Sequence, residues 1–139
     1  MAIYNAKKLL FDESLLDILS ASVLDPTPKR LKSRVDAYIE DKTFEVYAYK
    51  SDDKNIGIII FNISNDICVI HDFAVKKDSR AKGIGSKLVD YVVENFKPKK
   101  IIAETDNNSV GFYEKYGFTI TEISKTYDDA KYLCVLQVN

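Results

Sequence analysis

The segment Val75–Ser86 constrains the fold of this chain more than any other. An apolar run, Ile67–Val75, leads into a charged loop that reads Arg-Ala-Lys-Gly-Ile-Gly at residues 80–85 and opens into an amphipathic helix. A strand, a cationic glycine loop and a helix start in this order form a pocket for a diphosphate, because unpaired N–H groups and the positive end of the helix dipole face the anion. The glycines let the backbone approach the anion, since they carry no Cβ atom.

Composition limits the class of protein. The chain has 139 residues, and we expect one domain over residues 1–139. A net charge of −1 gives no bulk attraction for nucleic acid or an anionic membrane. The absence of a signal peptide and of an apolar run near ~18 residues predicts a cytoplasmic protein. Cys68 and Cys134 lie in apolar runs, as buried reduced thiols do, and one histidine provides no zinc-type cluster, so we expect no metal.

In the first half of the chain, the pattern predicts helices followed by strands. Asp12 caps a first helix and Thr27 a second, with Pro28 at the first helical position of the latter. Three strands follow at 43–50, 56–63 and 67–75, and residues 2–5 carry a weak pattern for a short first strand. Because the turns between the three strands are short, these strands are expected to be antiparallel neighbours.

The second half predicts one parallel crossover and a closing hairpin. A helix over 83–96 and a strand over 101–105 form a strand-helix-strand unit with 67–75, which implies parallel pairing. A short helix over 109–116 ends at Gly117 as its C-cap, and strands at 118–125 and 131–138 pair across 127–129. The predicted fold class is therefore α/β (α+β), with a mixed, mostly antiparallel sheet.

Two motifs together resemble the GCN5-related N-acetyltransferase (GNAT) superfamily. Phe73-Ala74-Val75, followed by Arg80-Ala81-Lys82-Gly83-Ile84-Gly85, looks like the family's Arg-x-x-Gly-x-Gly pyrophosphate loop after its fourth strand. Residues 108–118 look like its late helix with the signature Phe-Tyr-Glu-Lys-x-Gly-Phe. The resemblance implies a splay between the fourth and fifth strands and helices on both faces of the sheet. Two other glycine loops do not fit. A Rossmann dinucleotide-binding loop would need a third glycine, and a Walker A phosphate-binding loop would need an earlier glycine, and the sequence has neither.

The resemblance implies acetyl-CoA as the acyl donor. N–H groups of residues 81–86 and the charges of the loop would hold the pyrophosphate, and in the family the pantetheine arm enters the splay and bonds to strand backbone. Asn107 stands beside Asp106, the position at which the family often has an asparagine that helps hold the cofactor. The expected cofactor-binding residues are Phe73, Ala74, Val75, Arg80, Ala81, Lys82, Gly83, Ile84, Gly85, Ser86, Asn107 and Tyr113.

The resemblance also implies catalytic roles. Tyr113 matches the family tyrosine that protonates the departing thiolate; a phenol with a pKa of ~10 is neutral at pH 7 and can donate. The implied acceptor is an amine, which must lose a proton before it attacks. His71, where many relatives carry a glutamate, and Glu104, at the end of the next strand, are the candidate bases, although some relatives use only ordered water.

The resemblance leaves more than one function open. The first is N-acetyl transfer to a primary amine by direct attack in a ternary complex. The alternatives are acetylation of a peptide or protein N-terminus and a non-catalytic acyl-CoA-binding or regulatory module on the same scaffold. The acceptor, a small-molecule or peptide amine, is not identified by any segment. Dimers are common in the family, which leaves a homodimer open by analogy.

Overall fold

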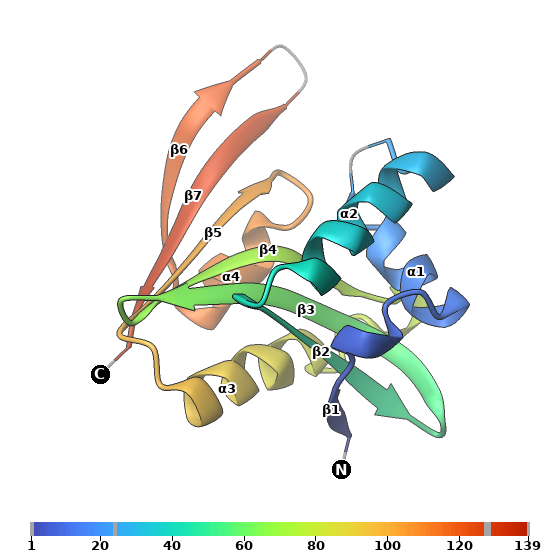
Figure 1. Cartoon of the computed structure of the whole chain (residues 1–139). Coiled ribbons are helices and arrows are strands. Elements are labelled where there is room, and N and C mark those ends of the chain that lie inside the picture. Colours follow the sequence, from blue (N-terminus) through green and yellow to red (C-terminus); the bar gives the residue numbers. More distant parts are fainter. Residues whose placement is uncertain (1, 24, 127–128, 139) are drawn as a thin grey trace.

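The computed structural model describes residues 2–23, 25–126 and 129–138. In these ranges seven strands form one sheet in the order β1-β2-β3-β4-β5-β7-β6 (Figure 1). Neighbouring strands are antiparallel except β4 and β5, which are parallel. The predicted fold class is confirmed. The strands are β1 (Ile3–Asn5), β2 (Phe44–Ser51), β3 (Lys54–Ser64), β4 (Ile67–Val75), β5 (Lys100–Asp106), β6 (Thr119–Lys125) and β7 (Ala130–Gln137).

Helices cover both faces of the sheet, as predicted. On one face lie α1 (Glu13–Ser20) and α2 (Pro28–Glu40), and on the other lie α3 (Ile84–Phe96) and α4 (Val110–Tyr116) (Figure 1). The Asp12 side chain accepts a hydrogen bond from the Ser14 amide, and the Thr27 side chain accepts one from the Arg30 amide. Both predicted N-caps are therefore confirmed. Two short 3-10 helices, η1 (Lys7–Leu9) and η2 (Lys77–Ser79), complete the list.

The sheet separates two apolar cores. The first packs α3 and α4 against β3, β4, β5 and β7, and the second packs α1 and α2 against the opposite face of β2, β3 and β4. Both cysteines belong to the first core as buried free thiols, as predicted. None of the helices within the described ranges is long and apolar enough to cross a membrane.

Two tight turns set the register of β2, β3 and β4. Asp52 and Asp53 have φ of 51° and 62°, and Asn65 and Asp66 have φ of 54° and 66°. Two consecutive residues with positive φ are typical of the type I′ turn, whose twist matches that of a hairpin. The first turn occupies only two residues, so β3 begins at Lys54, earlier than the predicted residue 56. Part of the predicted 127–129 turn lies outside the described residues.

A β-bulge in β4 reverses its two faces. On the neighbouring β3, Ile60 pairs with Asp72 and Phe61 pairs with Ile70, so His71 is an extra residue without a partner in the register. Even-numbered residues before the bulge pack on the α3 side, whereas those after it face α1 and α2. The bulge therefore brings His71 and Asp72 to the same side of the sheet, where the α1–α2 segment lies.

Candidate functional site

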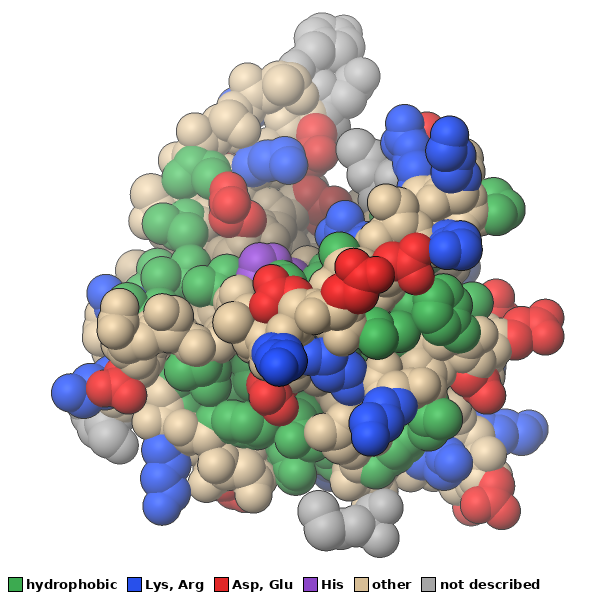
Figure 2. Space-filling model, in the orientation of Figure 1, with side chains coloured by type: hydrophobic (Ala, Val, Ile, Leu, Met, Phe, Trp, Pro, Cys, Tyr) green, Lys and Arg blue, Asp and Glu red, His purple; other side chains and the backbone are tan. Residues whose placement is uncertain are grey.

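A cleft of about 1310 Å³ opens where β4 and β5 separate. Parallel pairing extends only from Ile67 with Lys100 to Ile70 with Ala103, and beyond it both strands line the cleft. Figure 2 shows the surface hollowed between the β6–β7 hairpin and α2, with acidic and basic side chains at the rim. The predicted splay between the fourth and fifth strands is present.

The start of α3 presents a row of amide N–H groups to the cleft. Gly83 is the N-cap residue, with a φ of 78°, and no side chain caps the helix. Within the described residues, no acceptor pairs with the amides of residues 81–86, whereas the next amide, that of Lys87, donates to Gly83 O. Free amides at the positive end of a helix form an anion site. This geometry fits the phosphates of a nucleotide coenzyme.

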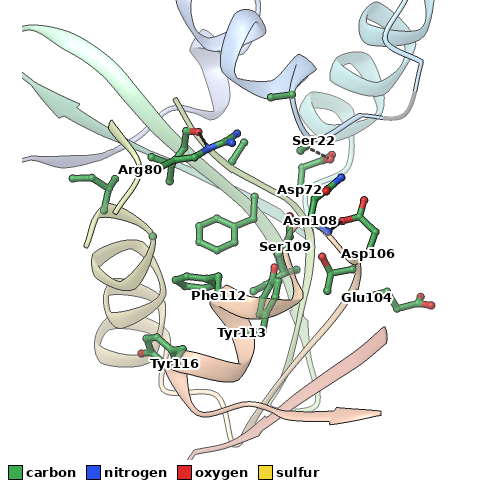
Figure 3. Close-up of a pocket in the computed structure, with 18 of the residues that line it drawn as sticks. Ser22, Asp72, Arg80, Glu104, Asp106, Asn108, Ser109, Phe112, Tyr113 and Tyr116 are labelled. Atoms are coloured by element: carbon green, nitrogen blue, oxygen red, sulfur yellow. Dashed lines mark hydrogen bonds between the residues drawn. The ribbon is translucent and has the colours of Figure 1, made fainter. Parts of the chain in front are cut away.

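Arg80 and Ala81 shape the approach to this helix start. The Arg80 Nε–H donates to Val75 O over 3.0 Å, which holds the guanidinium at the end of β4 (Figure 3). Ala81 has a φ of 65°, a conformation that glycine adopts without the steric cost of a Cβ atom. The loop therefore contains one strained residue directly after its arginine.

Gly85 allows aromatic side chains to pack against the first turn of α3. The rings of Phe73 and Phe112 lie edge to face, with their centroids 5.2 Å apart. Phe112 is labelled in Figure 3. A Cβ atom at Gly85 would lie 3.0 Å from Phe112 Cε1 and 3.2 Å from Phe73 Cζ. The glycine therefore allows close packing between α3, α4 and the splay.

We expect Gly85→Ala to lower the free energy of unfolding by about 1–2 kcal/mol, because overpacking outweighs the gain in helix propensity. The measurement is urea unfolding followed by circular dichroism. Gly111→Ala is the matched control on α4, since a Cβ atom there meets nothing within 4 Å. This control should raise stability by up to about 1 kcal/mol. Equal effects of the two changes would contradict the packing argument.

Tyr113 lines the cleft from α4 and is only 4% exposed. Its ring packs among Phe73, Phe112 and Phe118, with centroid distances of 6.1, 5.3 and 5.1 Å. Burial raises the pKa of the phenol above its usual value of 10, and the nearby Cys134 thiol adds to the effect. The hydroxyl therefore keeps its proton throughout the physiological pH range and is available as a donor.

The two predicted bases lie on either side of the splay and both line the cleft. The Nε2 atom of His71 lies 3.1 Å from Asn62 Oδ1, and its ring packs edge to face on Phe44. Desolvation lowers the pKa of His71 from 6.5, partly opposed by the charge of Asp72. Glu104 is exposed on β5, and its carboxylate points away from Tyr113 (Figure 3).

Comparison with known proteins identifies the family. Residues 22–132 match the family profile described as an acetyltransferase (GNAT) domain. The chain belongs to the GNAT acetyltransferase family. The prediction made from the glycine loop and the late helix is thus confirmed, and the cleft described above is the splay of a GNAT domain. Among curated proteins, no sequence matches this chain.

Solved acetyltransferase structures share the fold over most of their length. An acetyltransferase from Bacillus subtilis in complex with CoA is 23% identical, with a TM-score of 0.72 over 99% of this chain and 97% of that one. An aminoglycoside 6′-N-acetyltransferase complexed with coenzyme A is 18% identical, with a TM-score of 0.73 over 99% and 97%. A Bacillus anthracis protein assigned as a streptothricin acetyltransferase, in complex with acetyl coenzyme A, is 26% identical, with a TM-score of 0.62 over 75% and 68%.

The GNAT cleft gathers most of the residues that the sequence singled out. Two predicted cofactor residues, Lys82 and Asn107, are not among the lining residues. The Asn107 amide donates to Asp129 over 3.3 Å, and its carbonyl accepts from Tyr132 over 2.8 Å. Its neighbour Asn108 lines the cleft instead. The predicted residues that do line it are His71, Phe73, Ala74, Val75, Arg80, Ala81, Gly83, Ile84, Gly85, Ser86, Glu104 and Tyr113. Their roles stay predictions.

A buried carboxylate with three side-chain partners in the wall of the GNAT cleft was not predicted from the sequence. Asp72 is bonded to Ser22, Arg34 and Tyr38, which all come from the α1–α2 segment. The clue in the sequence is a carboxylate within an otherwise apolar strand, but its partners lie 34 to 50 residues away. In the described part of the chain, no three His, Cys, Asp or Glu side chains are grouped as metal ligands.

Proposed function

We propose that this chain is an N-acetyltransferase that moves the acetyl group of acetyl-CoA to a primary amine. The observation that carries the proposal is the row of free amides at residues 81–86. All of these residues except Lys82 line the same cleft as the buried Tyr113. The same cleft then offers both a site for a diphosphate and a proton donor. Membership of the GNAT family supports this assignment.

The geometry of the cleft supports the proposed binding roles. The amides of residues 81–86 donate to the pyrophosphate, and the Arg80 guanidinium, anchored on Val75 O, adds positive charge. Beyond Ile70 the backbone of β4 is no longer paired with β5, so its free polar groups are available to the pantetheine amides. Gly85 lets the Phe73 and Phe112 rings pack against the first turn of α3.

The chemistry is direct attack in a ternary complex. The amine nitrogen forms a bond to the acetyl carbon as the bond from that carbon to the CoA sulfur breaks. His71, Glu104 or an ordered water takes the proton that the amine loses, and Tyr113 donates the proton that the sulfur gains. The raised pKa of Tyr113 keeps this proton in place until the thiolate develops.

Thiol release from acetyl-CoA across a panel of small amines and peptides tests the function, with calorimetric titration of CoA run beside it. Turnover of a small amine supports the proposal, and turnover of peptides alone would favour N-terminal acetylation. Tight CoA binding without turnover of any amine would overturn the proposal and favour a non-catalytic module. No CoA binding at millimolar concentration would remove the anion site as well.

The pH profile distinguishes the two candidate bases. If His71 takes the proton, kcat should fall as the pH drops through the pKa of the imidazole, because only the neutral ring accepts a proton. Desolvation lowers that pKa, so the acid limb should have its midpoint below 6.5. The measurement is kcat against pH with saturating substrates for the wild type and for His71→Gln. An acid limb that persists unchanged in His71→Gln would assign the role to Glu104 or water.

Several predictions about the setting of this activity accompany the proposal. We expect a single GNAT domain over residues 1–139, a cytoplasmic location, and no nucleic-acid or membrane partner. A homodimer stays open by analogy with relatives.

A further inference from the structure

Asp72 is the center of a fully satisfied hydrogen-bond cluster. It is 3% exposed, and among the residues that the structure describes it is the only charged residue that is buried. Its Oδ1 accepts from Ser22 Oγ over 2.6 Å and from Arg34 Nη2 over 3.2 Å. Its Oδ2 accepts from Arg34 Nε over 2.7 Å and from the Tyr38 hydroxyl. Four donors occupy the carboxylate, so it has no free lone pair for an amine in the cleft.

Arg34 is only half engaged by this cluster. A guanidinium has five N–H groups in a planar fork, and Asp72 takes one from Nε and one from Nη2. The edge formed by Nη1 and the second N–H of Nη2 has no acceptor among the residues described. The side chain is 40% exposed and lines the cleft. A preorganised bidentate donor edge therefore remains for a ligand.

The two walls of the cleft present opposite charge. On the wall that includes α2, Arg34 is paired with Asp72 of β4. The Arg34 side chain is 40% exposed and the Asp72 side chain only 1%, so a ligand in the cleft meets the positive charge of Arg34. Asp72 and Ser22 lie on the other side of the cleft from Arg80 in Figure 3. The opposite wall, from β5, β7 and the residue before β7, carries Glu104, Asp106, Lys131 and Asp129, three of them acidic.

We propose that Arg34 binds a carboxylate of the acceptor, so that the acceptor is a primary amine that also carries a carboxylate. The inference rests on the proposed function, because it assumes that the cleft receives an amine. The outer edge of the guanidinium matches a carboxylate in two parallel hydrogen bonds. Asp72 fixes the orientation of that edge, and the acidic wall attracts the ammonium end before it loses its proton.

Binding of matched ligands tests the inference without turnover. We would titrate ω-amino acids of increasing chain length, each beside its neutral primary amide, into the protein saturated with CoA. We expect the wild type to bind the best amino acid about tenfold to a hundredfold more tightly than its amide, because hydrogen bonds between two charged groups are stronger than those to a neutral amide. Equal affinity within every pair, or binding of neither member, would overturn the inference.

Variants assign the preference to Arg34. The double change Arg34→Met with Asp72→Asn removes both charges together and should abolish the preference. Arg34→Lys keeps a cation beside Asp72 but loses the planar fork, so the preference should fall several-fold in a protein that keeps its fold. Arg30→Gln is the matched control, because Arg30 lies on the same helix, is 60% exposed and pairs with Asp25 outside the cleft. A preference that survives in both Arg34 variants would overturn the inference.

The outcome separates this inference from the proposed function. A carboxylate preference that depends on Arg34, without thiol release from acetyl-CoA, would keep the binding site and overturn the activity. Thiol release with amines that lack any acid group, at rates unaffected by Arg34→Lys, would keep the activity and overturn the inference.

Discussion

Tyr113→Phe is expected to lower kcat by about a hundredfold or more, because it removes the donor that protonates the departing thiolate. The ring stays in place among Phe73, Phe112 and Phe118, so packing is preserved. The Kd for CoA should change by less than about threefold, since the phosphates bind at the start of α3. Thiol-release kinetics and calorimetric titration of CoA measure the two quantities.

Tyr91→Phe provides the control for this change. Tyr91 lies on α3, where its ring packs against Tyr47, and it does not line the cleft. Because Tyr91 lies outside the cleft, the Tyr91→Phe variant should have a kcat within about twofold of that of the wild type. Unchanged turnover in Tyr113→Phe would remove this residue from the acid role, and water would then have to protonate the sulfur.

Arg34→Met is expected to destabilise the fold by about 3 kcal/mol, because it leaves the Asp72 carboxylate buried without its cation. This loss of stability lies at the low end of the range for breaking a buried ion pair, because the Arg34 side chain is partly exposed to water. The double variant with Asp72→Asn should recover much of the loss, because no unpaired charge then remains. Urea unfolding with a common m-value measures both changes.

The asymmetry within this pair is a second check. Asp72→Asn alone should cost less than Arg34→Met, because the freed guanidinium is 40% exposed and can be solvated. Arg30→Gln, which breaks an exposed pair on the same helix, should change stability by less than about 1 kcal/mol. If Arg34→Met and Arg30→Gln had similar effects, the Asp72 cluster would not be a determinant of stability.

Features made by consecutive residues were predictable from the sequence. The caps at Asp12 and Thr27 and the glycine loop at 80–85 each use local hydrogen bonds or local backbone conformation, which neighbours in the chain specify. The parallel pairing of β4 and β5 followed from the handedness of a strand-helix-strand connection. The family resemblance predicted that Tyr113 and that loop share one cleft, and both line it.

Local pattern alone determined the order of the elements, the hairpin turns and the loop that fits a diphosphate. Only the tertiary structure decided that β7 lies between β5 and β6, that a bulge at His71 reverses the faces of β4, and that Asp72 meets Arg34. A continuous apolar strand does not specify its register, because either face can be buried, and a contact across 38 residues leaves no periodic trace in the sequence. The wall that would select the acceptor depends on these long-range contacts, whereas the loop that would bind the donor does not.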